Sequence, residues 1–101
     1  MEDITVEELK KRLDNKEDLF IIDVREPHEY AEFNIGAENI PLGTLPMKMW
    51  DFDDKKDAEI IVHCRSGSRS TNAKALLMQS GFKNVRNLTG GMLEWQAKFS
   101  K

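Results

Sequence analysis

The chain has 101 residues, of which 40% are hydrophobic and 33% are charged, and its net charge is −3. This length fits a single domain over residues 1–101, and the slight acidic excess argues against general nucleic-acid binding. Because no hydrophobic run could cross a bilayer and the acidic N-terminus lacks the apolar core of a signal peptide, we expect no membrane partner and a cytoplasmic location.

The N-terminal residues predict a short edge strand and a helix. Ile4 fits the strand, and Thr5 with Glu8 matches a capping box, in which each side chain accepts a hydrogen bond from the other residue's backbone. Hydrophobic residues then recur at helical spacing, at Val6, Leu9 and Leu13. The polar residues 14–18 predict a solvated connection.

Residues 19–22 form a continuous apolar run, which is typical of a strand buried on both faces. Asp23 and Arg25 follow where this strand leaves the core. A short helix is predicted over residues 27–33, since it begins with a proline, and Glu26 is its candidate N-cap. Ligands of parallel sheets bind beyond the carboxyl ends of the strands. Asp23 and Arg25 therefore either support a functional crevice there or form an ion pair that stabilises the loop.

Residues 37–41 predict a short third strand that Pro41 terminates, and Thr44 is a candidate cap for a following helix. An apolar cluster comes next, at Met47, Met49 and Trp50. This cluster either fills the core or lines a pocket beside the cysteine loop described below. The strongly charged residues 51–58 predict a solvated surface linker.

The only cysteine of the chain, Cys64, lies where a predicted strand ends and a helical pattern begins. The loop after it consists of Arg65, Ser66, Gly67, Ser68, Arg69 and Ser70. Backbone N–H groups and the positive end of the helix dipole gather at such a junction, and Arg65 and Arg69 add two permanent charges. Each feature favours the thiolate, so we interpret Cys64 as a reactive nucleophile rather than a small core residue.

A single cysteine also limits the chemistry. It excludes an internal disulfide and a resolving cysteine, so any sulfur placed on Cys64 must be removed by another molecule. Together with His28 and His63 it matches no zinc-ligand spacing, and we expect neither a metal nor another cofactor.

The C-terminal third predicts a helix, a strand and a second helix. The buried face of the first helix is expected to hold Ala73, Leu76, Leu77 and Ser80. Gly81 is its predicted stop, with Phe82 closing the cap, and residues 84–88 predict the last strand. Gly90 and Gly91 then turn the chain into the final helix. Since strands alternate with helices throughout, we expect a parallel sheet covered on both faces.

Four blocks of the sequence resemble the rhodanese homology superfamily, a family of sulfurtransferases. The blocks are residues 23–30, 36–41, 64–70 and 88–95, and they occur in the family's order over nearly the whole chain. The segment 33–37 is one residue shorter than the family usually has. The resemblance implies a three-layer α/β/α fold around a central five-stranded parallel sheet.

The resemblance also implies the activity of a thiosulfate sulfurtransferase. Cys64 would take the sulfane sulfur of a small anionic donor such as thiosulfate, hold it as a persulfide and pass it to cyanide, a thiol or an acceptor protein. Backbone N–H groups of residues 65–69 would surround the sulfur, and extra donors would be the hydroxyls of Ser66, Ser68 and Ser70.

The two loop arginines are expected to have different roles. We expect Arg65 to bind the anionic donor and Arg69 to brace the loop against Asp23 or Glu29. We expect the chain to act as a monomer.

Two other functions are compatible with these residues. Cysteine phosphatases and arsenate reductases place five residues between the cysteine and an arginine, whereas four separate Cys64 from Arg69, so phosphate should fit poorly. A non-catalytic rhodanese-like binding or regulatory module is the second alternative, although such a module would be expected to lack the cysteine.

Overall fold

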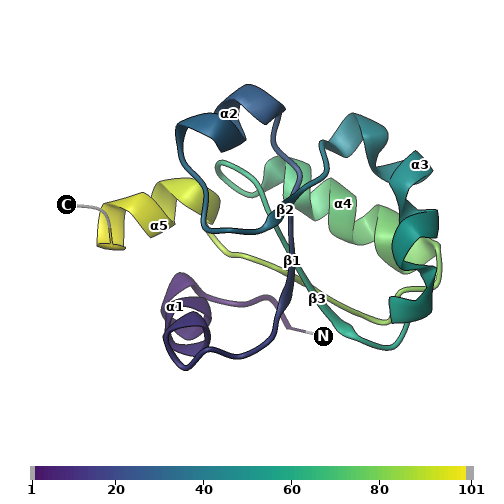
Figure 1. Cartoon of the computed structure of the whole chain (residues 1–101), viewed down its shortest axis with the longest axis horizontal. Helices are drawn as coiled ribbons and strands as arrows, with labels where there is room; N and C mark the ends of the chain where they lie inside the picture. Colours follow the sequence, from purple (N-terminus) through teal and green to yellow (C-terminus); the bar gives the residue numbers. More distant parts are fainter. Residues whose placement is uncertain (1, 100–101) are drawn as a thin grey trace.

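The computed structural model describes residues 2–99 and arranges them as a parallel sheet between two layers of helices (Figure 1). The sheet has four strands in the order β2-β1-β3-β4 within these residues. The strands are β1 (Phe20–Asp23), β2 (Glu38–Asn39), β3 (Glu59–His63) and β4 (Asn84–Asn87). Every pairing between them is parallel, which confirms the predicted class and layering.

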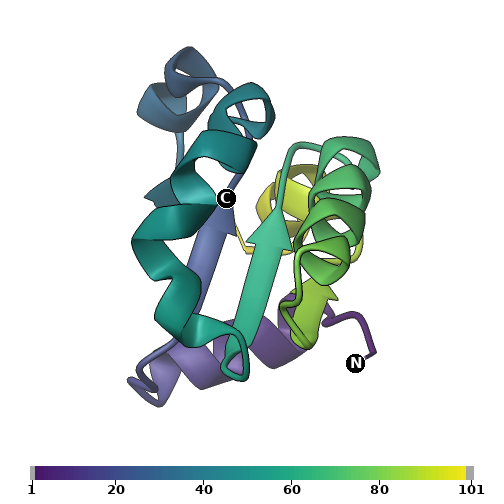
Figure 2. The ribbon, with the colours of Figure 1, turned by 90° about the vertical axis from the view of Figure 1, so that its right-hand side faces the viewer.

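The helices are α1 (Val6–Asp14), α2 (Pro27–Glu32), α3 (Leu45–Lys48), α4 (Ser68–Gln79) and α5 (Gly91–Phe99), with 3-10 segments η1 (Leu42–Thr44) and η2 (Met49–Lys55). Figure 2 shows α3, η2 and α4 in front of the sheet, with α5 behind it. Helix α2 lies beyond the carboxyl ends of the strands (Figure 1). No helix in the described part of the chain is long and apolar enough to span a membrane.

The predicted fifth strand is reduced to a single residue. Ile4 forms one parallel bridge with Leu88; its N–H donates to the Asn87 carbonyl at 3.0 Å, and its own carbonyl accepts from the Thr89 N–H at 2.9 Å. The strand stops there because Thr5 is already the N-cap of α1. The sheet therefore has four strands and a bridge where five strands were expected.

The capping box predicted for α1 forms only in part. The Thr5 hydroxyl accepts a hydrogen bond from the Glu8 N–H at 3.1 Å, as expected. The Glu8 carboxylate, however, accepts from the Arg86 guanidinium at 2.9 Å, and within residues 2–99 the reciprocal hydrogen bond from the Thr5 N–H is not formed. A charged donor from β4 binds a carboxylate more strongly than a neutral N–H does, so the tertiary contact prevails over the local one.

Hydrophobic residues fill both faces of the sheet, because successive side chains of a strand point to opposite sides. In β3, Ile60 and Val62 pack on the side of α4, whereas Ile61 packs on the side of α1 and α5. Helix α4 contributes Ala73 and Leu77 to its side, as the sequence predicts. The other two predicted residues, Leu76 and Ser80, are only half-buried.

Residues 44–58 differ from the prediction. Thr44 precedes α3, but its hydroxyl donates to the Pro41 carbonyl at 3.0 Å and does not cap the helix. The expected linker instead contains η2, from which Phe52 packs between Phe20 and Phe82 with ring centroids 5.3 and 5.5 Å away. A single buried residue is enough to hold such a short helical segment against the core. The charged residues around Phe52 therefore leave no hydrophobic pattern from which the segment could be predicted.

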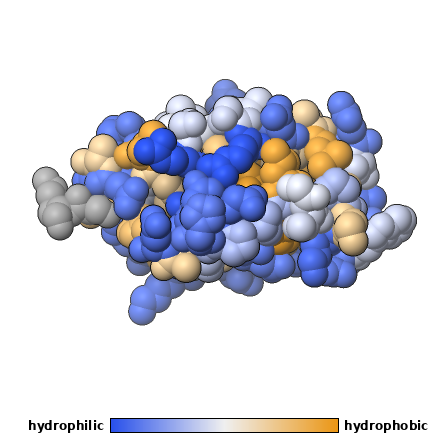
Figure 3. All heavy atoms as spheres, turned by 90° about the horizontal axis from the view of Figure 1, so that it is seen from above, coloured by the Kyte–Doolittle hydropathy of each residue, from blue (hydrophilic) through white to orange (hydrophobic). Residues whose placement is uncertain are grey.

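The apolar cluster at residues 47–50 contributes to the core only through Met49, which packs against the hydrophobic cluster on the α4 side. Met47 and Trp50 are each 79% exposed, while Met49 is half-buried. Met49 and Trp50 line a pocket of about 210 Å³ together with Ser80 and Phe82, which lie at the end of α4 remote from Cys64. Seen from above, the surface shows hydrophobic residues among hydrophilic ones (Figure 3). The cluster thus does line a pocket, but not one beside the cysteine loop.

Asp23 and Arg25 form the buried ion pair that was one of the two sequence interpretations. The Arg25 Nη2 lies 2.8 Å from Asp23 Oδ2, and the same nitrogen donates to the Phe33 carbonyl at 2.6 Å. His63 is fully buried beside them, with its Nε2 3.8 Å from Asp23 Oδ2. Within residues 2–99, neither ring nitrogen of His63 has a hydrogen-bond partner. Burial lowers the pKa of His63 to about 4. The charge of Asp23 raises this pKa and the charge of Arg25 lowers it, but both effects are smaller than that of burial.

This depressed pKa predicts a pH-dependent stability. Unfolding exposes His63, whose pKa then returns from about 4 to its ordinary 6.5, so the unfolded chain binds a proton that the folded chain does not. The free energy of unfolding should therefore fall by roughly 3 kcal/mol as the pH drops through this window. Urea unfolding at several pH values measures the fall.

The matched control is His63→Leu, which retains His28 and cannot titrate at position 63. Its free energy of unfolding should change much less between pH 6.5 and about pH 4. A wild-type protein with constant stability across the window would show that His63 is not held neutral by burial. Losses at lower pH are expected from carboxylates such as Glu29, whose pKa is lowered to about 2.

Candidate active site

The candidate site is the loop that joins β3 to α4. Cys64 follows the last residue of β3 directly, and α4 begins at Ser68 after Gly67 as N-cap. Gly67 has a φ of +119°, a conformation that side chains with a Cβ rarely adopt. Helix α4 thus starts within the predicted loop of residues 65–70, and its first turn lies beside the cysteine.

Hydrogen-bond donors surround the sulfur of Cys64. The Gly67 N–H donates to Sγ at 3.1 Å and the Ser70 N–H donates at 3.4 Å. The Ser70 hydroxyl also lies 3.4 Å from Sγ. Ser70 supplies two of these contacts because it stands in the first turn of α4, one residue beyond the predicted range of N–H donors.

The predicted hydroxyl donors are thus only partly correct. Ser66 and Ser68 are exposed, and of the three loop serines only Ser70 brings its hydroxyl to Sγ in the described structure. A helical first turn directs residue 70 inward and residue 68 outward, which a loop sequence by itself does not reveal. The Ser66 N–H remains part of the donor set around the sulfur.

Two opposing effects set the acidity of Cys64, whose residue surface is only 1% exposed. Burial raises the pKa of the thiol, since it penalises the thiolate. The Ser70 hydroxyl and the N–H groups of Ser70, Gly67 and Ser66 lower it by stabilising the charged sulfur. The hydrogen bonds prevail, so the pKa of Cys64 lies below its ordinary value. A thiolate is the nucleophilic form of cysteine, and this site favours it.

Arg69 is paired with Glu29 of α2. Its Nη1 and Nη2 donate to the two carboxylate oxygens at 2.7 and 2.9 Å. The hydrogen bonds from Arg69 are the main reason that the pKa of Glu29 falls to about 2. Of the two partners considered for Arg69, Glu29 is correct and Asp23 is not, because Arg25 already occupies Asp23.

Arg65 has a different environment. It is exposed and lines a pocket of about 390 Å³ between α2 and α5, which also contains His28 and Gln96. Within residues 2–99, no carboxylate lies within ion-pair distance of the Arg65 guanidinium. It is therefore the cation next to Cys64 that can bind an anion without first breaking an ion pair.

The N-terminus of α5 holds the cysteine loop from the other side. The Met92 N–H donates to the Cys64 carbonyl at 2.9 Å, and the Leu93 N–H donates to the Arg65 carbonyl at 2.9 Å. Gly91 permits this approach, because a Cβ there would lie 2.6 Å from each of the two carbonyl oxygens. The sequence showed Gly91 only as part of a turn; a double glycine just before a helix was the available signal of close packing.

Asn87 of β4 is a second residue that sequence reasoning missed. Its carbamoyl oxygen accepts a hydrogen bond from the Ser70 hydroxyl at 2.5 Å. It is 7% exposed, and among residues 2–99 it is joined to Ser70 and not to Cys64 by a side-chain hydrogen bond. A polar residue at the buried end of a predicted strand was the only signal for it.

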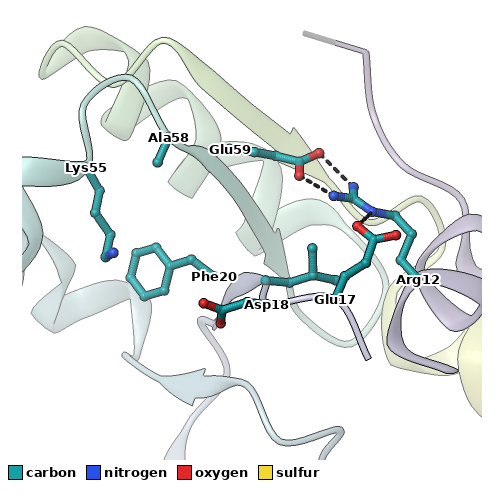
Figure 4. Close-up of a pocket in the computed structure, with 8 residues that line it drawn as sticks. Arg12, Glu17, Asp18, Phe20, Lys55, Ala58 and Glu59 are labelled. Atoms are coloured by element: carbon teal, nitrogen blue, oxygen red, sulfur yellow. Dashed lines mark hydrogen bonds and ion pairs between the residues drawn. The ribbon is translucent and has the colours of Figure 1, made fainter. Parts of the chain in front are cut away.

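Another pocket, of about 500 Å³, lies at the opposite end of the sheet (Figure 4). Arg12 in this pocket is paired with Glu59 at 2.6 Å and with Glu17 at 2.9 Å. Lys55 lies over the ring of Phe20, 5.4 Å from its centroid. With its arginine neutralised and no nucleophile in its lining, this pocket offers less chemistry than the cysteine loop. No group of three or more potential metal ligands occurs among residues 2–99.

Comparison with known proteins shows what this chain is similar to. The sequence model of the family described as "Rhodanese-like domain" matches residues 5–98. A sulfurtransferase of Allochromatium vinosum is 39% identical over 94 residues, which cover 92% of this chain and 86% of the relative. The thiosulfate sulfurtransferase GlpE of Pseudoalteromonas translucida is 32% identical over 88 residues, covering 86% and 82%. The structure of the human single-domain sulfurtransferase TSTD1 superimposes with a TM-score of 0.84 at 26% identity and covers 97% of each chain.

The packing at Gly91 predicts the effect of Gly91→Ala. The added methyl group would overlap two backbone carbonyls, so the loop or α5 must move. The free energy of unfolding should fall by about 1 to 3 kcal/mol more than in a control that shares only the backbone strain. Alkylation of Cys64 should also slow, since the displaced loop no longer directs its N–H groups at Sγ.

The control is Gly36→Ala. Gly36 has a φ of +83°, compared with +58° for Gly91, but a Cβ there meets no atom within 4 Å. Urea unfolding and the rate of alkylation by iodoacetamide compare the two variants. Equal losses of stability in both would contradict the contact between Gly91 and the loop.

Proposed function

Because the chain belongs to the rhodanese-like domain family, we propose that it transfers a sulfane sulfur from thiosulfate to a thiophilic acceptor through a persulfide on Cys64. The observation that carries this proposal is the set of donors around Sγ from Gly67 and Ser70. These donors favour a sulfur anion in a nearly buried position. A nucleophilic sulfur of this kind is what the first step requires.

In the first step, the Cys64 thiolate attacks the outer sulfur of thiosulfate. The bond between the two sulfurs of thiosulfate breaks, and its electron pair leaves with sulfite. Cys64 then carries a persulfide with a single negative charge. In the second step, cyanide or a thiolate attacks the outer sulfur of the persulfide, and the electron pair of that S–S bond returns to Sγ. Charge and atoms balance in both steps, and the kinetics are expected to be ping-pong.

The shape of the site favours a narrow donor atom. Cys64 is only 1% exposed, so an incoming group must reach Sγ through the ring of backbone atoms. A single terminal sulfur meets this requirement better than a tetrahedral phosphate does. Because Cys64 is the only cysteine of the chain, the acceptor must be another molecule: a small thiol, cyanide or an acceptor protein.

We assign binding of the anionic donor to Arg65. Its guanidinium has no carboxylate partner among residues 2–99 and borders the pocket next to the loop. A planar guanidinium with several N–H donors suits the oxygens of thiosulfate. The ion pair with Glu29 leaves Arg69 to connect α4 with α2.

The same pair weakens the phosphatase alternative, in which an arginine would bind the phosphate oxygens. Both terminal nitrogens of Arg69 donate to Glu29, and the loop is one residue short for a phosphate. A non-catalytic binding module is also less well supported. Nothing in such a module would require hydrogen-bond donors directed at the cysteine sulfur.

Intact-mass measurement before and after incubation with thiosulfate tests the persulfide. The wild type should gain the mass of one sulfur atom and lose it again with cyanide. Cys64→Ser, which keeps the size of the side chain, should gain nothing. No gain on the wild type while Cys64 is still alkylated would exclude thiosulfate as donor. Faster cleavage of an aryl phosphate through Cys64 would favour the phosphatase instead.

Steady-state kinetics with Arg65→Ala tests the donor site. Loss of a charge-assisted hydrogen bond should lower kcat/KM for thiosulfate roughly tenfold or more, with little change in Tm. Lys83→Ala is the control, because Lys83 is exposed and lies just before β4, at the end of the sheet remote from Cys64. It removes the same charge from the protein without removing it from the site. Equal kcat/KM in the two variants would place donor binding elsewhere.

A further inference from the structure

Ser70 faces more acceptors than it has protons. Its hydroxyl oxygen lies 2.5 Å from the Asn87 carbamoyl oxygen, 3.1 Å from the Gly67 carbonyl and 3.4 Å from Cys64 Sγ. A serine hydroxyl carries one proton, so it can donate strongly to only one of these atoms at a time. Ser70 is fully buried, which keeps bulk water from serving the others.

The neighbours of Asn87 determine which way its amide group points. The Asn87 Nδ2 donates to the Thr71 hydroxyl at 3.2 Å, and that hydroxyl itself donates to the Gly67 carbonyl at 2.7 Å. Because the Thr71 proton is used in this way, its oxygen must accept from Asn87. The NH₂ group of Asn87 therefore faces Thr71, and its carbamoyl oxygen faces Ser70.

The Gly67 carbonyl is a weak competitor for the Ser70 proton. It already accepts the Thr71 N–H at 2.9 Å as well as the Thr71 hydroxyl. A carbonyl oxygen has two lone pairs, and both are occupied. The proton of Ser70 is thus shared between Asn87 and the sulfur of Cys64.

We propose that Asn87 is a positioning residue for the sulfur chemistry, which holds the Ser70 proton while Cys64 is a thiol and yields it to Sγ when the sulfur becomes an anion. In the thiol state, the S–H of Cys64 donates to Ser70, and Ser70 donates to Asn87. When the thiol gives its proton to a base in the solvent, such as hydroxide or a buffer anion, the Ser70 hydroxyl rotates about its Cβ–Oγ bond and donates to the thiolate. Asn87 then loses its short hydrogen bond.

This arrangement opposes the formation of the thiolate by the strength of one hydrogen bond. Such opposition has a chemical use, because the nucleophilicity of a thiolate falls together with its pKa. A cysteine surrounded by donors risks becoming a stable but unreactive anion. By competing for the proton of Ser70, Asn87 keeps the pKa of Cys64 nearer to the working pH, where attack on a sulfane sulfur is fastest.

The charged groups around Cys64 do not interfere with the effect of Asn87 on the pKa of the thiol. From α4 and α2 these are Arg69 and Glu29, and beside β4 they are Asp3 and its partner Lys74. The loop itself adds Arg65, which is the same in every variant compared below. The pKa of Glu29 is about 2, that of Asp3 is lowered despite partial burial, mainly by its hydrogen bond from Lys74, and that of Arg69 is raised by its hydrogen bonds to Glu29.

Two histidines remain to be considered. His63 precedes Cys64 and stays neutral above about pH 4. His28 of α2 lines the pocket beside Arg65, but it is the same in every variant compared below, so its contribution cancels.

The test is the pH dependence of Cys64 alkylation by iodoacetamide, which reports the pKa of the thiol. Asn87→Leu has nearly the size of asparagine and lacks the acceptor, so it should lower the pKa by about half a unit to one unit. Below the pKa, the larger fraction of thiolate outweighs the lower nucleophilicity of each thiolate, so alkylation should be roughly two- to fourfold faster. Ser70→Ala should raise the pKa. In the Ser70→Ala background, Asn87→Leu should change the pKa no further.

Two results would overturn the proposal. One is an unchanged or raised pKa in folded Asn87→Leu. The other is an equal fall in the presence and absence of the Ser70 hydroxyl, since Asn87 would then not act through Ser70. If circular dichroism shows that Asn87→Leu does not fold, Asn87→Ala replaces it with the same expectation, because it only removes atoms.

The proposal rests on Cys64 being the nucleophile of the proposed sulfur transfer, but alkylation does not require that transfer. A protein that shows the predicted pKa changes and forms no persulfide would contradict the proposed function alone. A protein that forms the persulfide and lacks the pKa changes would contradict only the role of Asn87.

Discussion

The cysteine loop depends on one constraint: its carbonyls must point away from the sulfur so that its N–H groups can point toward it. The start of α5 meets this constraint from outside, since Met92 and Leu93 donate to the carbonyls of Cys64 and Arg65. The start of α4 meets it from inside, where Gly67 and Ser70 direct their N–H groups at Sγ. The same loop thus receives hydrogen bonds on its outer side and gives them on its inner side.

The parallel sheet explains why the polar residues of the site gather at one end. Asp23 and His63 are aligned partners in β1 and β3, so both strands release the chain at the same edge. His63 and Cys64 then point to opposite faces, and Cys64 joins the core on the α4 side. One face carries the buried Asp23–Arg25 ion pair, and the other carries the nucleophile.

The ion pairs around the site determine which arginine remains available to bind an anion. Arg25 is held by Asp23, and Arg69 is held by Glu29. Both pairs connect α2, or the loop before it, to the rest of the site. Arg65 has no such partner in the described structure, so it is the arginine suited to a diffusible anion. The two ion pairs therefore contribute rigidity, and the unpaired residue contributes binding.

Local sequence determined the alternation of strands and helices, the position of Cys64 between a strand and a helix, and the family resemblance. Each of these depends on neighbouring residues: apolar runs, glycines, caps and a loop of small and basic residues. Phe52 was missed because its anchoring contacts, Phe20 and Phe82, are remote in sequence.

Tertiary structure alone decided the partners. It chose Glu29 for Arg69, Arg86 for Glu8, and Ser70 rather than Ser66 or Ser68 for the sulfur. It also brought Gly91 and Asn87 to the loop from parts of the chain whose sequence shows only a turn and a strand end. Residue types and spacing record what a side chain can do, whereas which atom it reaches depends on how distant elements pack.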